Sequence, residues 1–227
     1  EEHIVDDRFE ELFDTYKTHK PERIPSYFAA NEVMRIEQSV SRNSANGKRN
    51  YAMLLLASRL GLRASDIANL QFSDIDWDKN MITLTMQKTK KVIELPLLAD
   101  VGNAIIDYLR HGRPKSDSQN VFLSGNAPYV AATKNMVCAA INGIILRSGV
   151  DTSGKHHDPH SLRHSLASAM LNGGSLMPVI SESLGHRSTQ TTLAYLKIDL
   201  RSLQKCALPV PEIADCFYMQ RGGAFYG

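Results

Sequence analysis

Residues 159–168 read Pro-His-Ser-Leu-Arg-His-Ser-Leu-Ala-Ser and open a stretch, 160–172, that is expected to be helical. Positions three apart share one face of a helix, so His160 and Arg163 are predicted to point the same way. A guanidinium presents a rigid planar set of donors that suits phosphate oxygens, and an imidazole beside it adds another donor. The stretch therefore predicts a helix that carries part of a phosphate-binding site.

Two other segments carry side chains of the same chemical kind. Arg63 follows Gly61-Leu62, and His186 follows Leu184-Gly185, with Tyr195 nine residues further on. When a phosphodiester is broken without a metal, negative charge accumulates on the non-bridging oxygens, and fixed cationic donors must stabilise it. A tyrosine hydroxyl provides a nucleophile. The joint occurrence of these residues predicts phosphodiester chemistry.

Proton transfer must accompany that chemistry. A free tyrosine phenol has a pKa of about 10, so cations and a histidine near Tyr195 would be needed to help remove its proton. The leaving deoxyribose 5′-oxygen needs a proton in return. Lys88, in the basic segment 87–91, is the candidate general acid, carried on a loop that closes on the scissile phosphate when DNA is present.

The pattern of apolar residues predicts a mainly α fold with a small antiparallel β-sheet, that is, an α+β fold. Strands 81–86 and 92–95 form a hairpin with a basic tip, and 72–75 is a candidate third strand. Asn31 is a candidate N-cap, and Gly61 is expected to close the second helix. Helices are predicted over 30–40, 48–60, 65–70, 99–111, 133–148, 160–172, 176–184, 188–196 and 199–206.

Composition is that of a globular protein, with 227 residues of which 43% are hydrophobic. No segment approaches the roughly 20 apolar residues of a membrane helix. The three cysteines form no C-x-x-C pair, which favours reduced thiols in the cytosol. The chain starts with Glu1 and has no signal-peptide pattern, so we expect a fragment of a longer protein.

The net charge of +2 conceals an uneven distribution. Residues 1–40 carry a charge of −5, whereas the remainder of the chain carries +7. A basic body of this kind is able to bind a polyanion, although many ordinary proteins share the pattern.

The segments 61–67, 159–168 and 184–195 resemble the three signature boxes of the tyrosine recombinase, or phage integrase, family. The hairpin segment 87–91, which leads into Glu-Leu-Pro-Leu at 94–97, resembles the fourth element of that family. The resemblance covers residues 21–200 with the elements in the family's order. Gln87 departs from it, since the family often has glycine before the hairpin lysine.

The resemblance implies a role for each residue. Arg63 and Arg163 would clamp the phosphate, Lys88 would protonate the leaving 5′-oxygen, and His160 would assist proton transfer at Tyr195. His186 would hydrogen-bond the phosphate, and Tyr195 would form a 3′-phosphotyrosyl bond. No metal or other cofactor would be needed, because the covalent bond conserves the energy of the phosphodiester.

The resemblance also implies partners and a domain plan. The partners would be double-stranded DNA and further copies of the chain, assembled as a tetramer on paired sites, and a mobile genetic element would be the usual setting. Residues 1–20 would be a linker from an N-terminal DNA-binding domain, 21–200 the catalytic domain, and 201–227 a tail that docks on a neighbouring subunit.

Other interpretations remain open for single residues and for the whole chain. His160 and His164 have the spacing of two zinc ligands, although no third ligand is evident. Tyr195 alone would suit a core aromatic, and Lys88 a solvated turn. For the whole chain, the alternatives are a type IB topoisomerase-like enzyme that relaxes DNA and a DNA-binding module with an inactive site.

Overall fold

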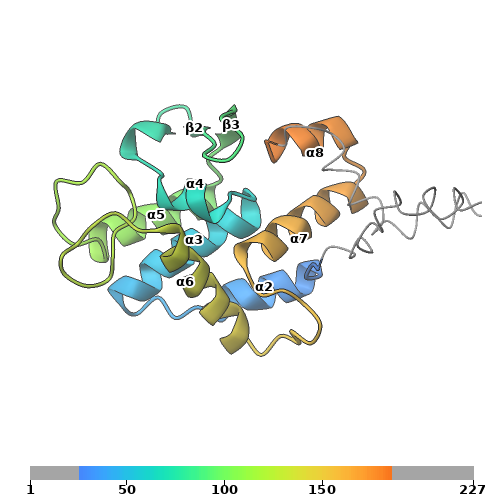
Figure 1. Cartoon of the computed structure of the whole chain (residues 1–227), viewed down its shortest axis with the longest axis horizontal. Helices are drawn as coiled ribbons and strands as arrows, with labels where there is room; N and C mark the ends of the chain where they lie inside the picture. The colour runs from blue at the N-terminus through green and yellow to red at the C-terminus, as the bar shows by residue number, and fades with distance from the viewer. Residues whose placement is uncertain (1–25, 186–227) are drawn as a thin grey trace, which may run out of the picture.

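The protein, represented by a computed structural model that describes residues 26–185, is mainly helical with one small antiparallel sheet (Figure 1). The predicted fold class is confirmed. In chain order the elements are α2 (Ala30–Gln38), α3 (Ala45–Arg59), α4 (Ala64–Ala68), the 3₁₀ helix η1 (Phe72–Asp74), β1 (Ile75–Asp76), β2 (Met81–Thr85), β3 (Val92–Pro96), α5 (Ala99–His111), α6 (Lys134–Arg147), α7 (Pro159–Asn172) and α8 (Met177–Ser183).

Helix α3 forms the centre of the fold. Residues 52–58 are all buried, and the helix packs against α5, α6 and α7. Figure 1 shows α3 in the middle of the described chain. A helical segment that is buried around its whole circumference needs partners on every side, which explains this position. Gly61 has a φ of +63° and follows the last residues of α3, so the predicted glycine stop is confirmed.

The sheet has the order β1-β2-β3, and both pairings are antiparallel. Ile82 pairs with Leu95, and Leu84 pairs with Ile93, and all four side chains are buried. The strands therefore turn one apolar face to the core, as alternation in the sequence predicts. The turn between β2 and β3 is closed by two backbone hydrogen bonds of 2.9 Å, from Lys90 N to Met86 O and from Met86 N to Lys91 O.

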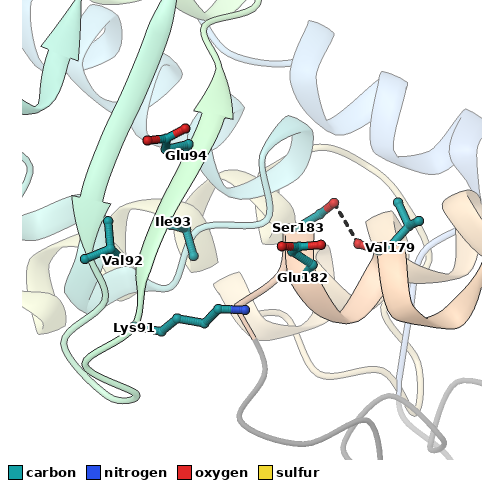
Figure 2. Close-up of a pocket in the computed structure, with 7 residues that line it drawn as sticks. All are labelled: Lys91, Val92, Ile93, Glu94, Val179, Glu182 and Ser183. Atoms are coloured by element: carbon teal, nitrogen blue, oxygen red, sulfur yellow. Dashed lines mark hydrogen bonds between the residues drawn. The ribbon is translucent and has the colours of Figure 1, made fainter.

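Helix α8 packs on α7 through a small apolar cluster of Ala167, Ile180 and Leu184. Its other side faces strand β3, and between the two lies a cavity of about 480 Å³ (Figure 2). The cavity is lined by Lys91, Val92, Ile93, Glu94, Val179, Glu182 and Ser183. None of the four predicted catalytic residues that the structure describes lines it.

Local capping changes two of the predicted boundaries, and one N-cap residue also differs from the prediction. Asp74 Oδ2 accepts the Gln71 N–H at 2.8 Å, so residues 72–74 form a 3₁₀ turn, and only 75–76 pair as a strand. Ser44 Oγ accepts the Gly47 N–H at 3.0 Å, so α3 begins at Ala45, ahead of the predicted start at 48. The N-cap of α2 is Ala29, and Asn31 lies within the helix.

No helix in residues 26–185 is long and apolar enough to cross a membrane. The helices predicted over 188–196 and 199–206, and the expected linker and tail, lie outside the described residues.

Candidate active site

Arg163 lies in the interior of the protein, with only 2% of its surface exposed. Its guanidinium donates to the backbone carbonyl of Gly61 at 2.6 Å and also to the carbonyl of Leu184. Gly61 lies two residues before Arg63, and Leu184 lies two residues before His186. One buried cation therefore joins the three segments that carry the predicted arginines and the second histidine.

Gly61 permits this close approach. A Cβ at position 61 would lie 2.7 Å from Leu184 Cδ2 and 3.0 Å from Leu166 Cδ2, in a backbone conformation that other residues rarely adopt. The chain turns directly after it, and Arg63 becomes the N-cap residue of α4 with a half-buried side chain. The guanidinium of Arg63 donates to Met86 Sδ at 3.4 Å.

Lys88 is an exposed residue of the β2–β3 turn, and the turn is attached to α4 through a carboxylate. Asp66 Oδ1 accepts the Gln87 N–H at 2.8 Å, and Asp66 is only 3% exposed. Because a buried carboxylate needs hydrogen bonds, this contact fixes the hairpin beside Arg63. Asp66 lies within the segment 61–67, and its position in the helix turn after Arg63 was an available signal for this role.

Four of the six predicted residues line one open cleft of about 480 Å³: Arg63, Lys88, His160 and Arg163. They come from α4, the hairpin turn and α7, so segments up to 100 residues apart converge there. The remaining lining residues are Ala64, Ser65, Gln87, Lys134, Cys138, Asp158 and Pro159. His186 and Tyr195 lie outside the described residues.

Three cations of the cleft lower the pKa of His160. His160 is an exposed residue that lines the cleft, and the protein around it partly desolvates its ring. Burial lowers the pKa of His160, Asp158 opposes that shift, and the positive charges of Arg163, Arg63 and Lys88 lower the pKa further. His160 is therefore neutral at neutral pH, which is the form that accepts a proton.

His164 packs against His160, with ring centroids 4.2 Å apart. Burial lowers the pKa of His164 to about 4, with smaller contributions in the same direction from His160 and Arg163. Within residues 26–185 no group of three or more His, Cys, Asp or Glu side chains is arranged to hold a metal ion.

Sequence reasoning missed three polar residues of the cleft. Lys134 opens α6 and adds a fourth positive charge. Asp158 caps α7 by accepting the Ser161 N–H at 2.9 Å, which fixes the start of the helix that carries His160 and Arg163. Burial raises the pKa of the Cys138 thiol, so this residue stays in the thiol form at neutral pH. Only their convergence in the fold brings these residues to the site.

Comparison with models of protein families identifies the family of this chain. The model of the phage integrase family matches residues 26–201. The chain belongs to the phage integrase family. The matched range includes His186 and Tyr195, so all six predicted residues lie within it.

Curated relatives of this chain are named as integrases or recombinases. It is 41% identical over 193 residues to y4rA of Sinorhizobium fredii, named as an integrase/recombinase, and covers 46% of that protein. It is 35% identical to y4gC of the same organism and covers 97% of it. It is 29% identical to tyrosine recombinase XerC of Staphylococcus aureus and covers 62% of it. These alignments use 85%, 83% and 83% of this chain. The chain thus spans about half the length of y4rA.

Solved structures of recombinases share the fold. XerA recombinase superposes with a TM-score of 0.68 at 24% identity, over 85% of this chain and 67% of XerA. XerH, bound to its palindromic difH substrate after cleavage, superposes with a TM-score of 0.69 at 20% identity, over 81% of this chain and 53% of XerH. The catalytic domain of tyrosine recombinases is therefore the fold of this chain.

Proposed function

We propose that this chain is the catalytic part of a site-specific DNA recombinase that cuts and rejoins strands through a 3′-phosphotyrosyl intermediate. The convergence of Arg63, Lys88, His160 and Arg163 on one cleft carries the proposal. Family membership supports it, because the match extends over the segment with His186 and Tyr195.

In the proposed reaction the Tyr195 oxygen attacks the scissile phosphorus, the bond to the 5′-oxygen breaks, and the strand is left with a free 5′-hydroxyl. Arg63, Arg163 and His186 stabilise the charge on the non-bridging oxygens. His160 accepts the phenol proton. Burial and neighbouring cations lower the pKa of His160, which keeps its imidazole in the neutral form that can accept this proton. Lys88 donates a proton to the leaving 5′-oxygen. Attack by a second 5′-hydroxyl reverses these steps.

The partner is proposed to be double-stranded DNA. XerH is named as bound to difH, and lambda integrase as a dimer bound to a core site. An integrase of transposon Tn1549 is named in complex with a circular DNA intermediate, which supports a role in moving a mobile genetic element. The bacterial cytosol is the proposed location. We further propose assembly on paired sites as a tetramer, with residues 1–20 as linker and 201–227 as a tail that docks on a neighbouring subunit.

Covalent capture tests the proposal. The wild-type chain and Tyr195→Phe are incubated with nicked duplexes taken from the ends of the parent element, or with a randomised pool, and the samples are denatured in detergent. Wild type should retain covalently attached DNA, whereas Tyr195→Phe should bind DNA but retain none. An adduct formed equally by both proteins would exclude Tyr195 as the nucleophile.

Two further experiments separate the alternatives. Relaxation of supercoiled plasmid without a defined site, by a monomer, would favour a topoisomerase-like enzyme. Binding without any adduct, repeated with the full-length parent protein, would favour an inactive DNA-binding module.

A further inference from the structure

We propose that Met86 is a positioning residue of the active site: its thioether orients the Arg63 guanidinium and supports the backbone that leads to His186. The inference rests on the proposed strand-transfer function, because the reaction is what would report the orientation of Arg63. Met86 is not one of the residues that the reaction itself requires, since it is apolar and transfers no proton.

The first observation is a contact with the clamping arginine. Arg63 Nη1 donates to Met86 Sδ at 3.4 Å, and Met86 is fully buried. A thioether is a weak but polarisable acceptor, and it can take one guanidinium N–H without adding a negative charge. A carboxylate at this place would instead compete with the phosphate for Arg63. The sulfur thus contacts the guanidinium without placing a negative charge beside it.

The second observation is that the same sulfur also lies against the backbone directly before His186. Gly185 has a φ of +58°, and a Cβ built at that position would collide with Met86 Sδ. Ile93 Cγ2 would lie 3.1 Å from the same Cβ. The backbone directly before His186 therefore rests on the Met86 side chain. Together with the Arg163 bond to the carbonyl of Leu184, this contact determines where the chain leaves α8.

The third observation concerns the hairpin. The backbone of Met86 closes the turn, since its carbonyl accepts the Lys90 N–H and its N–H donates to the carbonyl of Lys91, both at 2.9 Å. Lys88 lies within the turn that these two bonds close. One residue therefore contacts or adjoins the segments of Arg63, Lys88 and His186.

Leucine fills nearly the same volume as methionine but accepts no hydrogen bond, so Met86→Leu separates the sulfur from the packing. Met53→Leu is the matched control, because Met53 is also buried, at 1% exposure, and lies within α3 outside the cleft. The measurements are the rate of covalent adduct formation at saturating nicked DNA, the DNA dissociation constant and the melting temperature.

We expect Met86→Leu to lower the rate of adduct formation by about three- to tenfold, on the scale of the net contribution of one typical hydrogen bond. DNA affinity and melting temperature should match those of Met53→Leu. In an Arg63→Ala background, Met86→Leu should cause no further loss, since the thioether acts through Arg63.

Two results would overturn the inference while leaving the proposed function intact. One is a Met86→Leu rate equal to that of Met53→Leu. The other is an equal loss from Met86→Leu in the presence and absence of Arg63, which would assign Met86 to packing alone. Failure of the wild-type chain to form an adduct would instead contradict the proposed function.

Discussion

At the scale of the residue, Lys88 differs from the two arginines of the cleft because it is exposed and lies on a turn. A general acid typically contributes about 10²–10⁴-fold to a rate. Lys88→Ala is therefore expected to lower cleavage of normal DNA by that order. A substrate with sulfur in the 5′-bridging position has a leaving group that needs no proton, so the variant should cleave it nearly as fast as wild type.

Single-turnover cleavage of both substrates measures this difference. Equal loss on both substrates would make Lys88 a phosphate-binding residue and place the general acid elsewhere. Lys79→Ala is a suitable control, because Lys79 forms an ion pair with Asp76 outside the cleft.

His160 leads to a prediction about pH. Burial, together with the charges of Arg163, Arg63 and Lys88, lowers the pKa of His160 below the ordinary histidine value of about 6.5. A base works in its neutral form, so lowering the pKa extends activity to more acidic solution. The acid limb of the cleavage rate should therefore fall below pH 6.5. A single-turnover pH profile measures it, and a limb at or above pH 6.5 would contradict this role.

At the scale of the element, apolar periodicity was sufficient to predict the helices of the core and the β2–β3 hairpin. It failed where a single side chain caps the backbone, as Asp74 does at Gln71 and Ser44 does at Gly47. Such contacts are local but leave no periodic pattern. The burial of Arg163 was not predictable either, because it depends on carbonyls of Gly61 and Leu184 in other segments.

The attachment of the hairpin to α4 gives a prediction at this scale. Asp66→Ala removes the acceptor of the Gln87 N–H and should loosen the turn that carries Lys88. We expect adduct formation to fall by about tenfold, since small misplacements of catalytic groups are costly. The free energy of unfolding should fall by about 1–3 kcal/mol.

Asp74→Ala is the matched control for that experiment. It removes the same kind of bond, from Asp74 to the Gln71 N–H, at a place outside the cleft. Chemical denaturation should show a loss of stability in both variants, whereas only Asp66→Ala should slow adduct formation. An unchanged rate in Asp66→Ala would show that Lys88 does not depend on this anchor.

At the scale of the whole molecule, a net charge of +2 gives little indication of DNA binding, whereas the fold gathers Arg63, Lys88, Lys134 and Arg163 at one cleft. Each phosphate neutralised on duplex DNA contributes about −0.9 to the slope of log affinity against log salt concentration. Four such contacts predict a slope of about −3 to −4.

Fluorescence anisotropy over a salt series measures the slope. Lys134→Ala should make the slope less negative by about 1, whereas Lys79→Ala should leave it unchanged. A slope near zero in the wild-type chain would contradict phosphate binding in the cleft.

The central claim is that Tyr195 becomes joined to the 3′ end of a cut strand. The most direct test is to isolate the detergent-resistant adduct, digest its protein and DNA, and identify the linked peptide and nucleotide by tandem mass spectrometry. We expect a phosphodiester from the Tyr195 oxygen to a 3′-phosphate, with a 5′-hydroxyl on the released strand. A bond to another residue, or to a 5′-phosphate, would contradict it.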